Sequence, residues 1–406
     1  MATAFQLDAV DANAVDANAL DANALAYSPL ISVVVPAYNA DAFIAGTLAS
    51  VLSQTYQNLE VWVVDDGSSD RTAAIVEKLA QQDARINLLR QPNQGVAIAR
   101  NAGIQAAKGE FIAPIDADDV WWPGALEKLM AEFQKMPATV GVVYAWSVDI
   151  DEQDRATGAF HASVIKGNVY KTLICHNFLG NASSTLIRKS CLDQIGGYSA
   201  ELRHRKAQGC EDWDLYLRLA EHCEFGVVPE FLVGYRKLAS SMSQDFSQMA
   251  RSQQQMLETV RQKHPEISPY LYCLSRSSFY LYLAQQCDQS NRPRRTLFWL
   301  KQAIEIDPIT PLLRPGVYVL FLKNWVRQVG EAAQKRPSPK TAFSKKYSPK
   351  RRSPNEMFSP AKSTVPRLST KCSTAMSPDV LSKTHRLKIL LKVSVGSVLH
   401  RLLLSV

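Results

Sequence analysis

The chain of 406 residues carries 46 Lys and Arg against 38 Asp and Glu, and 46% of its residues are hydrophobic. This length and this content allow one large domain, or two domains with appendages, around a sizeable core. No run of 18 uninterrupted apolar residues occurs, which excludes a predicted transmembrane helix.

The net charge of +8 is unevenly distributed along the chain. Residues 331–406 hold 16 Lys and Arg against 3 Asp and Glu (16 − 3 = +13), so residues 1–330 hold 30 against 35 (−5). A mildly acidic body with a strongly basic tail suggests that the tail meets a polyanion or an anionic membrane. Seven cysteines without a CxxC pair, and an N-terminus without the basic and apolar regions of a secretory signal, favour reduced thiols in a cytoplasmic protein.

Residues 1–28 form a leader with a repeat of five residues, DANAV at 11–15 and DANAL at 16–20 and 21–25. A period of five fits neither one face of a helix nor one face of a strand, so a disordered leader is predicted.

From residue 29 onward, apolar runs typical of buried strands alternate with segments of helical periodicity. Strands are predicted at 31–35, 59–64, 86–90, 110–115 and 140–144, and helices at 41–54, from 70, at 95–107, from 123 and at 213–220. This alternation predicts an α/β fold with a mostly parallel sheet, whereas the irregular residues 150–200 suit an antiparallel addition and loops. The predicted domain covers residues 29–245.

Three regions follow the predicted α/β domain. Residues 246–328 are expected to be helical and to contain one pair of helices of tetratricopeptide type, packed on the domain before them. Residues 329–384 are rich in Ser, Pro and Lys and are predicted to be a disordered basic linker. Residues 385–406 place basic and apolar side chains on different sides of a helical wheel, which predicts an amphipathic helix on a membrane surface.

Three acidic clusters carry the functional signal: DDGSSD at 65–70, DADD at 116–119 and EDWD at 211–214. The first two directly follow predicted strands, and the carboxyl ends of parallel strands are where open α/β sheets bind ligands. Carboxylates that meet at one crevice repel one another unless a cation or a proton relieves them. A divalent metal bound with a phosphorylated substrate would do so, which indicates an enzyme for nucleotide-activated substrates.

Five segments in this order resemble the family 2 glycosyltransferases, which have the GT-A fold of nucleotide-diphosphosugar transferases. They are SVVVPAYN (32–39), VDDGSSD (64–70), NQGVAIARNAG (93–103), DADD (116–119) and EDWD (211–214). The resemblance covers roughly residues 28–245. It implies an inverting, metal-dependent transferase that uses a UDP-sugar or a related donor, and synthesis of a cell-surface polysaccharide or glycolipid.

The resemblance also assigns residues to the donor. Pro36, Ala37 and Tyr38 would edge the base pocket, and Asp66 would bind the nucleobase, with an Asx turn as the structural alternative for Asp66 and the preferred role for Asp65. Asp116 and Asp118 match the DxD motif. Asp118 is the expected ligand of Mn²⁺ or Mg²⁺, while the structural alternative for Asp119 is a first-turn acid favoured by a helix dipole.

The third cluster would supply the chemistry. Asp212 matches the catalytic base, with a helix cap as its structural alternative, and Glu211 and Trp213 are assigned to the acceptor site. Arg100 either approaches the diphosphate or is an ordinary solvated arginine of a helix. The family often continues with Tyr-Arg-x-His, but residues 235–238 read YRKL, so Arg236 or Lys237 would replace the histidine as a charge near the diphosphate.

Two other functions remain open. A nucleotidyltransferase would need a Gly-rich basic loop after the first strand, which this chain lacks. A non-catalytic GT-A-like domain whose basic tail binds nucleic acid or an anionic membrane is the alternative from another class. Intact acidic clusters favour the enzyme, with a glycan or lipid-linked acceptor, and the tail favours lipid over nucleic acid. The expected location is cytoplasmic, peripheral on the inner face of the membrane.

Overall fold

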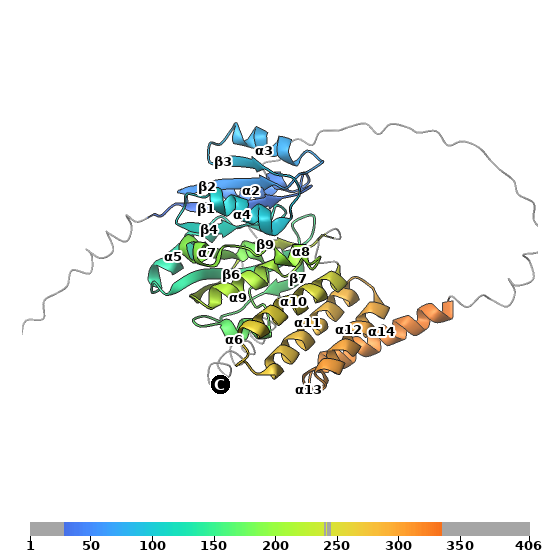
Figure 1. Cartoon of the computed structure of the whole chain (residues 1–406). Coiled ribbons are helices and arrows are strands. Elements are labelled where there is room, and N and C mark those ends of the chain that lie inside the picture. The colour runs from blue at the N-terminus through green and yellow to red at the C-terminus, as the bar shows by residue number, and fades with distance from the viewer. Residues whose placement is uncertain (1–27, 239–240, 242–244, 335–406) are drawn as a thin grey trace, which may run out of the picture.

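The computed structural model describes residues 28–238, 241 and 245–334. The predicted leader up to residue 27, the basic linker from residue 335 and the amphipathic helix at 385–406 lie outside these residues. The described chain forms an α/β body that continues into a stack of helices (Figure 1).

A nine-stranded sheet runs through the α/β body in the order β3-β2-β1-β4-β8-β6-β9-β5, with β7 paired to β6. Strands β1, β2, β3 and β4 are parallel, as are β6 and β9, while β8, β5 and β7 are antiparallel additions. The predicted fold class, a mostly parallel sheet flanked by helices and followed by a helical region, is confirmed. The strands are β1 (Ile31–Ala37), β2 (Leu59–Asp65), β3 (Ile86–Arg90), β4 (Phe111–Pro114), β5 (Val120–Trp121), β6 (Val140–Ile150), β7 (Ala156–His161), β8 (Thr185–Arg188) and β9 (Glu224–Arg236).

Helices cover both faces of the sheet because the parallel strands are apolar on both sides. Alternate residues of β1 face two cores: Ile31, Val33 and Val35 face one, and Val34 faces the other. The first core holds α2 (Ile44–Leu52), α3 (Thr72–Ala80) and α5 (Ala125–Lys135). The second holds α4 (Val96–Ala106), α6 (Tyr170–Cys175), α7 (Lys189–Ile195), α8 (Glu201–His204) and α9 (Glu211–Ala220).

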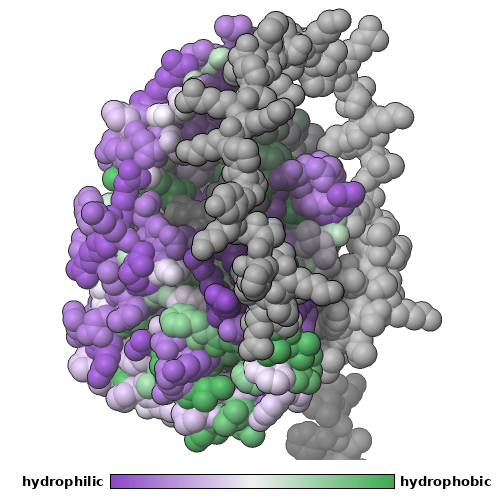
Figure 2. Space-filling model, turned by 90° about the vertical axis from the view of Figure 1, so that its right-hand side faces the viewer, coloured by the Kyte–Doolittle hydropathy of each residue, from purple (hydrophilic) through white to green (hydrophobic). Residues whose placement is uncertain are grey.

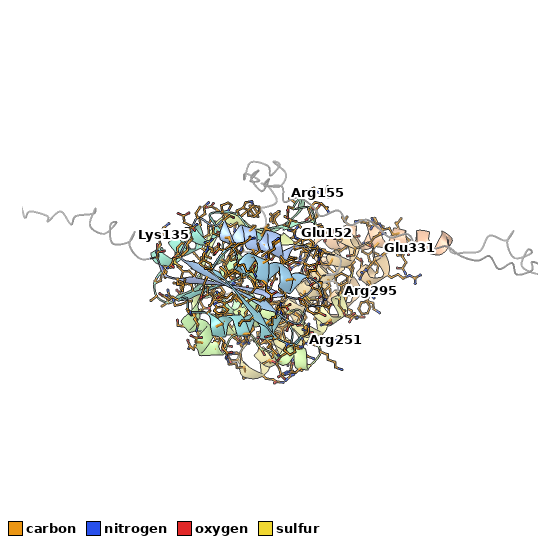
Figure 3. The ribbon with its side chains drawn as sticks, turned by 90° about the horizontal axis from the view of Figure 1, so that it is seen from above. Lys135, Glu152, Arg155, Arg251, Arg295 and Glu331 are labelled. Atoms are coloured by element: carbon orange, nitrogen blue, oxygen red, sulfur yellow. The ribbon has the colours of Figure 1, made fainter. Side chains whose placement is uncertain are left out.

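The C-terminal helices pack on the second core and then on one another. Met256 and Leu257 of α10 (Phe246–Lys263) and Tyr272 of α11 (Pro269–Gln289) join the second core. A third core lies among α10, α11, α12 (Pro293–Ile306) and α14 (Pro315–Gln334), with the short α13 (Ile309–Leu312) between the last two. Helix α14 therefore lies at the far end of the molecule: Figure 3 shows its Glu331 opposite Lys135 of α5.

The parallel strands agree with the predicted strands to within two residues, except that β6 continues from the predicted 140–144 to Ile150. The antiparallel addition expected within residues 150–200 is present as β7 and β8, although the bounds of these strands were not predicted, and β5 and β9 were not predicted at all. Gly226, Pro229 and Gly234 interrupt the strand pattern of β9. The pairing of β9 with β6 shifts register near the first two of these residues, at Val140/Val142 and around Trp146, whereas Gly234 pairs with Val148 without a shift.

Candidate active site

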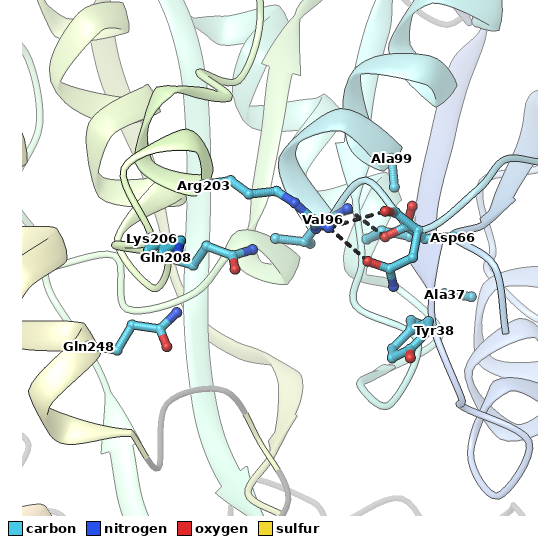
Figure 4. Close-up of a pocket in the computed structure, with 12 residues that line it drawn as sticks. Ala37, Tyr38, Asp66, Val96, Ala99, Arg203, Lys206, Gln208 and Gln248 are labelled. Atoms are coloured by element: carbon cyan, nitrogen blue, oxygen red, sulfur yellow. Dashed lines mark hydrogen bonds between the residues drawn. The ribbon is translucent and has the colours of Figure 1, made fainter. Parts of the chain in front are cut away.

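The carboxyl ends of β1 and β2 open into a cavity of ≈ 590 Å³ (Figure 4). Pro36, Ala37 and Tyr38, which were predicted to edge a base pocket, line it together with Asp66. The Asp66 N–H donates to the carbonyl of Ala37 (2.8 Å), so the ends of the two strands are tied together where the cavity begins. Tyr38 is 54% exposed and offers its ring to a planar ligand.

Asp66 also holds the loop that leads from β3 to α4. Its Oδ1 accepts from the Gln91 side chain (2.8 Å) and from the Gln94 N–H (2.7 Å), and its Oδ2 accepts from the Gly95 N–H (2.7 Å). A buried carboxylate with three donors is well satisfied, so Asp66 shapes the cavity floor in addition to lining it. Asp65 accepts from the Ser68 N–H (3.1 Å), which confirms its predicted role in a turn.

Four polar side chains form the opposite wall of the cavity. Figure 4 shows Arg203, Lys206, Gln208 and Gln248 across from Tyr38 and Asp66. Arg203 is anchored to Asn93 by two hydrogen bonds (3.1 and 2.9 Å) and crosses Gly95, where a Cβ would meet its Nη1 at 2.1 Å. Two cationic groups on one wall suit an anionic ligand.

None of these four residues was predicted. The run of basic residues at 203–206, ahead of the third acidic cluster, is a signal that could have indicated Arg203 and Lys206. Gln248 lies on α10, and no feature of its sequence surroundings indicates a site.

Helix α4 connects the cavity to a buried charged cluster. Val96 and Ala99 line the cavity, whereas the next residue, Arg100, is only 3% exposed. Its Nη2 lies 2.5 Å from Asp116 Oδ1, and its Nη1 lies 2.6 Å from Asp212 Oδ1. The solvated alternative for Arg100 is therefore wrong, and its partners in this structure are two carboxylates. One guanidinium joins the second and third acidic clusters and supplies a cation between them.

The ionisable side chains of this cluster shift one another's pKa values. Burial lowers the pKa of Arg100, but Asp212 and Asp116 raise it, and the net shift is upward. Burial raises the pKa of Asp212 to about 6 against the opposing charge of Arg100. Asp212 lies in the first turn of α9, and its side chain, in contact with Arg100, caps no helix N–H group. A carboxylate with a pKa near neutrality is suited to general base work.

Asp118 and Asp119 differ in their surroundings. Burial and the charge of Asp116 raise the pKa of Asp118 to about 6, and in the described chain its carboxylate accepts no hydrogen bond from another residue. Asp119 is fully buried and accepts from Ser183 Oγ (2.5 Å) and from the Arg236 N–H (2.8 Å). The interpretation of Asp119 as a first-turn acid is wrong, because α5 begins only at Ala125.

The two basic residues expected to replace the family histidine have other contacts. The Arg236 guanidinium donates to the carbonyls of Asp118 and Asp151 (both 2.6 Å) and pairs with Asp154 (2.6 Å). The Lys237 ammonium lies 4.0 Å from the centroid of the Tyr235 ring, and burial lowers the pKa of Lys237. Arg236 therefore fixes the backbone of the second cluster.

The two residues assigned to an acceptor site are buried. Trp213 is 4% exposed, and its indole N–H donates to the Leu173 carbonyl (2.7 Å), so its ring belongs to the second core and cannot stack on a sugar. Glu211 is 6% exposed and accepts from the Gly209 N–H (2.8 Å). Both stabilise the start of α9, because the helical period that places Asp212 toward Arg100 turns its neighbours inward.

The donor set fits a divalent ion that is bound jointly with a diphosphate. Within the described ranges, no three His, Cys, Asp or Glu side chains come together as a metal site. Mg²⁺ and Mn²⁺ sites on nucleotides commonly use one or two carboxylates, with phosphate oxygens and water completing the shell. Asp118, with Asp116 near enough to shift its pKa, offers such a partial shell.

Residues 32–196 match the model of the family described as Glycosyl transferase family 2. The chain is 41% identical over 123 residues to Glycosyltransferase GlyG of Streptococcus pneumoniae serotype 4 (strain ATCC BAA-334 / TIGR4), covering 30% of this chain and 41% of that protein. It is 31% identical over 199 residues to Chondroitin synthase of Pasteurella multocida (strain Pm70), covering 48% of this chain and 19% of that protein.

Among solved structures, the chain is similar to S. aureus TarS 1-349 in complex with UDP-GlcNAc, with a TM-score of 0.47 and 19% identity over 75% of this chain and 91% of that chain. The chain spans less than half the length of the curated relatives it matches. The family match confirms the resemblance of the motifs and, with the sheet described above, the expected GT-A fold. It ends before Glu211, so the third cluster is connected to the site by geometry alone.

Proposed function

We propose that the chain is an inverting, metal-dependent glycosyltransferase, because residues 32–196 match the model of glycosyl transferase family 2. The proposed donor is a nucleotide-diphosphosugar, with UDP-sugars first, and the acceptor is a hydroxyl of a glycan or a lipid-linked sugar in cell-surface polysaccharide or glycolipid synthesis. One observation carries the proposal: Arg100, which follows the cavity-lining Ala99 in α4, joins Asp116 of the second acidic cluster to Asp212 of the third.

The cavity is the proposed site of the nucleotide. Tyr38 would stack on the base, and Asp66, whose oxygens already hold the Gln91–Gly95 loop, would position that loop against it. Arg203 and Lys206 on the opposite wall would face the anionic part of the donor. Arg100 is proposed to act on the reaction through the two carboxylates that it orients, rather than through the diphosphate.

Asp212 is the proposed catalytic base. Its Oδ1 is held by Arg100, which leaves Oδ2 to take the proton from the acceptor hydroxyl. The acceptor oxygen then forms a bond to the anomeric carbon while the bond from that carbon to the diphosphate oxygen breaks, and the electron pair leaves with the diphosphate. Attack on the face opposite the leaving group inverts the anomeric configuration.

Asp118, assisted by Asp116, is proposed to hold Mn²⁺ or Mg²⁺. Such an ion neutralises the charge that develops on the leaving diphosphate. Removal of a proton from Asp118 at neutral pH prepares its oxygens as ligands, and the buried Arg236 keeps the backbone of this segment in place.

A lipid-linked acceptor would place the enzyme at a membrane. The described chain contains no helix that is long and apolar enough to cross one. We therefore propose peripheral association with the cytoplasmic leaflet, with the basic tail at 331–406 on anionic lipids.

The test is release of a nucleoside diphosphate from UDP-, GDP- and dTDP-sugars in the presence of Mn²⁺, measured for the unmodified chain and for Asp118→Ala and Asp212→Asn. Asp193→Asn, which removes a carboxylate from an exposed ion pair with Lys189, is the matched control. The proposal predicts turnover of one donor that is lost in both site variants and retained in the control. Absence of turnover and of binding with every donor, with or without lipid extract, would contradict it.

A further inference from the structure

Helix α14 carries a wide apolar face that points away from the protein. The face consists of Tyr318, Val319, Phe321, Leu322, Trp325, Val326 and Val329, whose exposed fractions range from 50% (Val329) to 67% (Val319). At 100° per residue these positions form one continuous stripe along the helix. Exposed apolar surface of this extent marks an interaction site.

The opposite side of α14 is the side that docks on the protein. Val317 and Asn324 are buried there, and Asn324 donates to Asp288 of α11 (2.9 Å). Lys323 and Arg327 pair with the same Asp288 at 2.7 and 3.2 Å. These contacts fix which way α14 faces, so the apolar stripe is presented outward by the fold itself.

The short helix before α14 extends the same apolar surface. Ile309 and Leu312 of α13 and the following Leu313 are 63%, 44% and 76% exposed. Figure 2 shows hydrophobic residues gathered along the lower part of the face on which α13 and α14 lie in Figure 1. We call this surface, residues 309–329, the α13–α14 face.

We propose that the α13–α14 face lies on an anionic lipid bilayer. The aromatic side chains Tyr318, Phe321 and Trp325 are of the kinds that membrane interfaces favour, and the helix is amphipathic rather than spanning. The chain that leaves α14, residues 335–406, holds 16 Lys and Arg against 2 Asp and Glu (+14). An apolar helix face that is followed in the sequence by a polybasic segment supplies the two signals that stable membrane anchoring needs.

Charge also decides against a second copy of this chain as the occupant. Pairing two α13–α14 faces would join two chains that each continue into a segment of +14, and like charges oppose such an association. An anionic lipid surface attracts the same segments. The inference builds on the membrane association proposed above and adds a second, apolar contact that the tail alone does not provide.

The experiment is co-sedimentation of the full chain with vesicles, either of phosphatidylcholine alone or of an equal mixture of phosphatidylcholine and phosphatidylglycerol. Phe321→Gln, Leu322→Gln and Trp325→Gln are combined in a face variant, which keeps the charge and the helix propensity of α14. A tail variant replaces Lys345, Lys346, Lys350, Arg351 and Arg352 by Gln and leaves the face intact.

The proposal predicts that the face variant binds both kinds of vesicle about tenfold or more weakly than the unmodified chain, because apolar burial is lost on either surface. The tail variant loses affinity for the anionic vesicles only, and that loss disappears at high salt. Unchanged vesicle binding by the face variant would overturn the inference. The inference would also be overturned if sedimentation velocity showed that the unmodified chain is a dimer and that the face variant is a monomer.

Two further measurements separate this inference from the proposed enzyme. The unfolding transition of the face variant should stay cooperative and its midpoint close to that of the unmodified chain, because the contacts of Lys323, Asn324 and Arg327 that dock α14 on Asp288 are left in place. Release of nucleoside diphosphate from a donor without vesicles should also be unchanged. If neither the unmodified chain nor any variant released nucleoside diphosphate, the proposed transferase activity would be contradicted. The vesicle-binding result would then be judged independently of that activity.

Discussion

Replacement of Arg100 by Met should destabilise the fold strongly, because the guanidinium is the cation between two acidic clusters. Arg100 is 3% exposed and pairs with Asp116 and Asp212, whose side chains are 28% and 25% exposed. Removal of one partner from a buried ion pair typically costs 3–5 kcal/mol, and the partial exposure of both carboxylates places Arg100→Met near the lower end, at about 3 kcal/mol.

The assay is urea unfolding at 25 °C, followed by tryptophan fluorescence, with Arg71→Met as the matched control. Arg71 pairs with Asp41 at 3.3 Å, but its side chain is 82% exposed, so its loss should cost at most about 1 kcal/mol. Adding Asp212→Asn to Arg100→Met should recover part of the lost stability, since the uncompensated charge is removed as well. Equal effects of the two arginine substitutions would refute the assignment of Arg100 as a buried bridge.

Three further outcomes are expected. Turnover of the donor should rise with pH through about 6, since Asp212 must be deprotonated to act as a base and burial raises its pKa to about 6. A rate profile that is flat between pH 5 and 8, or that falls as the pH rises through this range, would count against Asp212 as the base. Gly95→Ala should weaken nucleotide binding and lower the unfolding midpoint, because a Cβ at φ +88° is strained and would meet Arg203 Nη1 at 2.1 Å. Gly46→Ala is the contrast: Gly46 is an exposed position of α2 with nothing within 4 Å of a Cβ, so the substitution should stabilise by about 0.5–1 kcal/mol, and equal calorimetric midpoints would contradict this contrast. Removal of divalent ions by EDTA should abolish turnover and added Mn²⁺ should restore it, except in Asp118→Ala; full activity in EDTA would exclude the proposed metal.

The parallel half of the sheet could be predicted because its strands are short, apolar and buried on both faces. β4 and, apart from Ser32, β1 read as apolar runs, and the acidic residues at the ends of β2 and β4 mark the edge where the site forms. Pro36, Ala37, Tyr38 and Asp66 were assigned to one pocket by the family resemblance, and the structure places all four around one cavity.

In the second half of the sheet, an antiparallel addition was expected at residues 150–200, but the bounds and partners of β5, β7, β8 and β9 could not be predicted, because their pairing depends on partners that are distant in the chain. β5 has only two residues, and β9 contains glycine and proline positions that normally interrupt a strand. Helical spacing alone did not reveal that Trp213 turns into the core while Asp212 faces Arg100, since the tertiary contact of Arg100 with Asp212 spans 112 residues of sequence.

The orientation of α14 likewise could not be predicted from the sequence. The sequence from 312 to 326 is apolar with charged interruptions, a pattern that suits either a buried helix or an exposed one. Only the contacts of Lys323 and Arg327 with Asp288 show that the charged side is turned toward the protein and the apolar side toward the outside.

The central claim is that the active site has two separate parts: the nucleotide binds at the cavity around Asp66, and the transfer reaction takes place at Asp212. The most direct test measures two quantities on the same variants: the dissociation constant for the nucleoside diphosphate by calorimetry, and the rate of sugar transfer. The account predicts that Asp66→Ala loses nucleotide binding, while Asp212→Asn binds the nucleotide as the unmodified chain does and transfers no sugar. Sugar transfer by Asp212→Asn, or unchanged binding by Asp66→Ala, would contradict it.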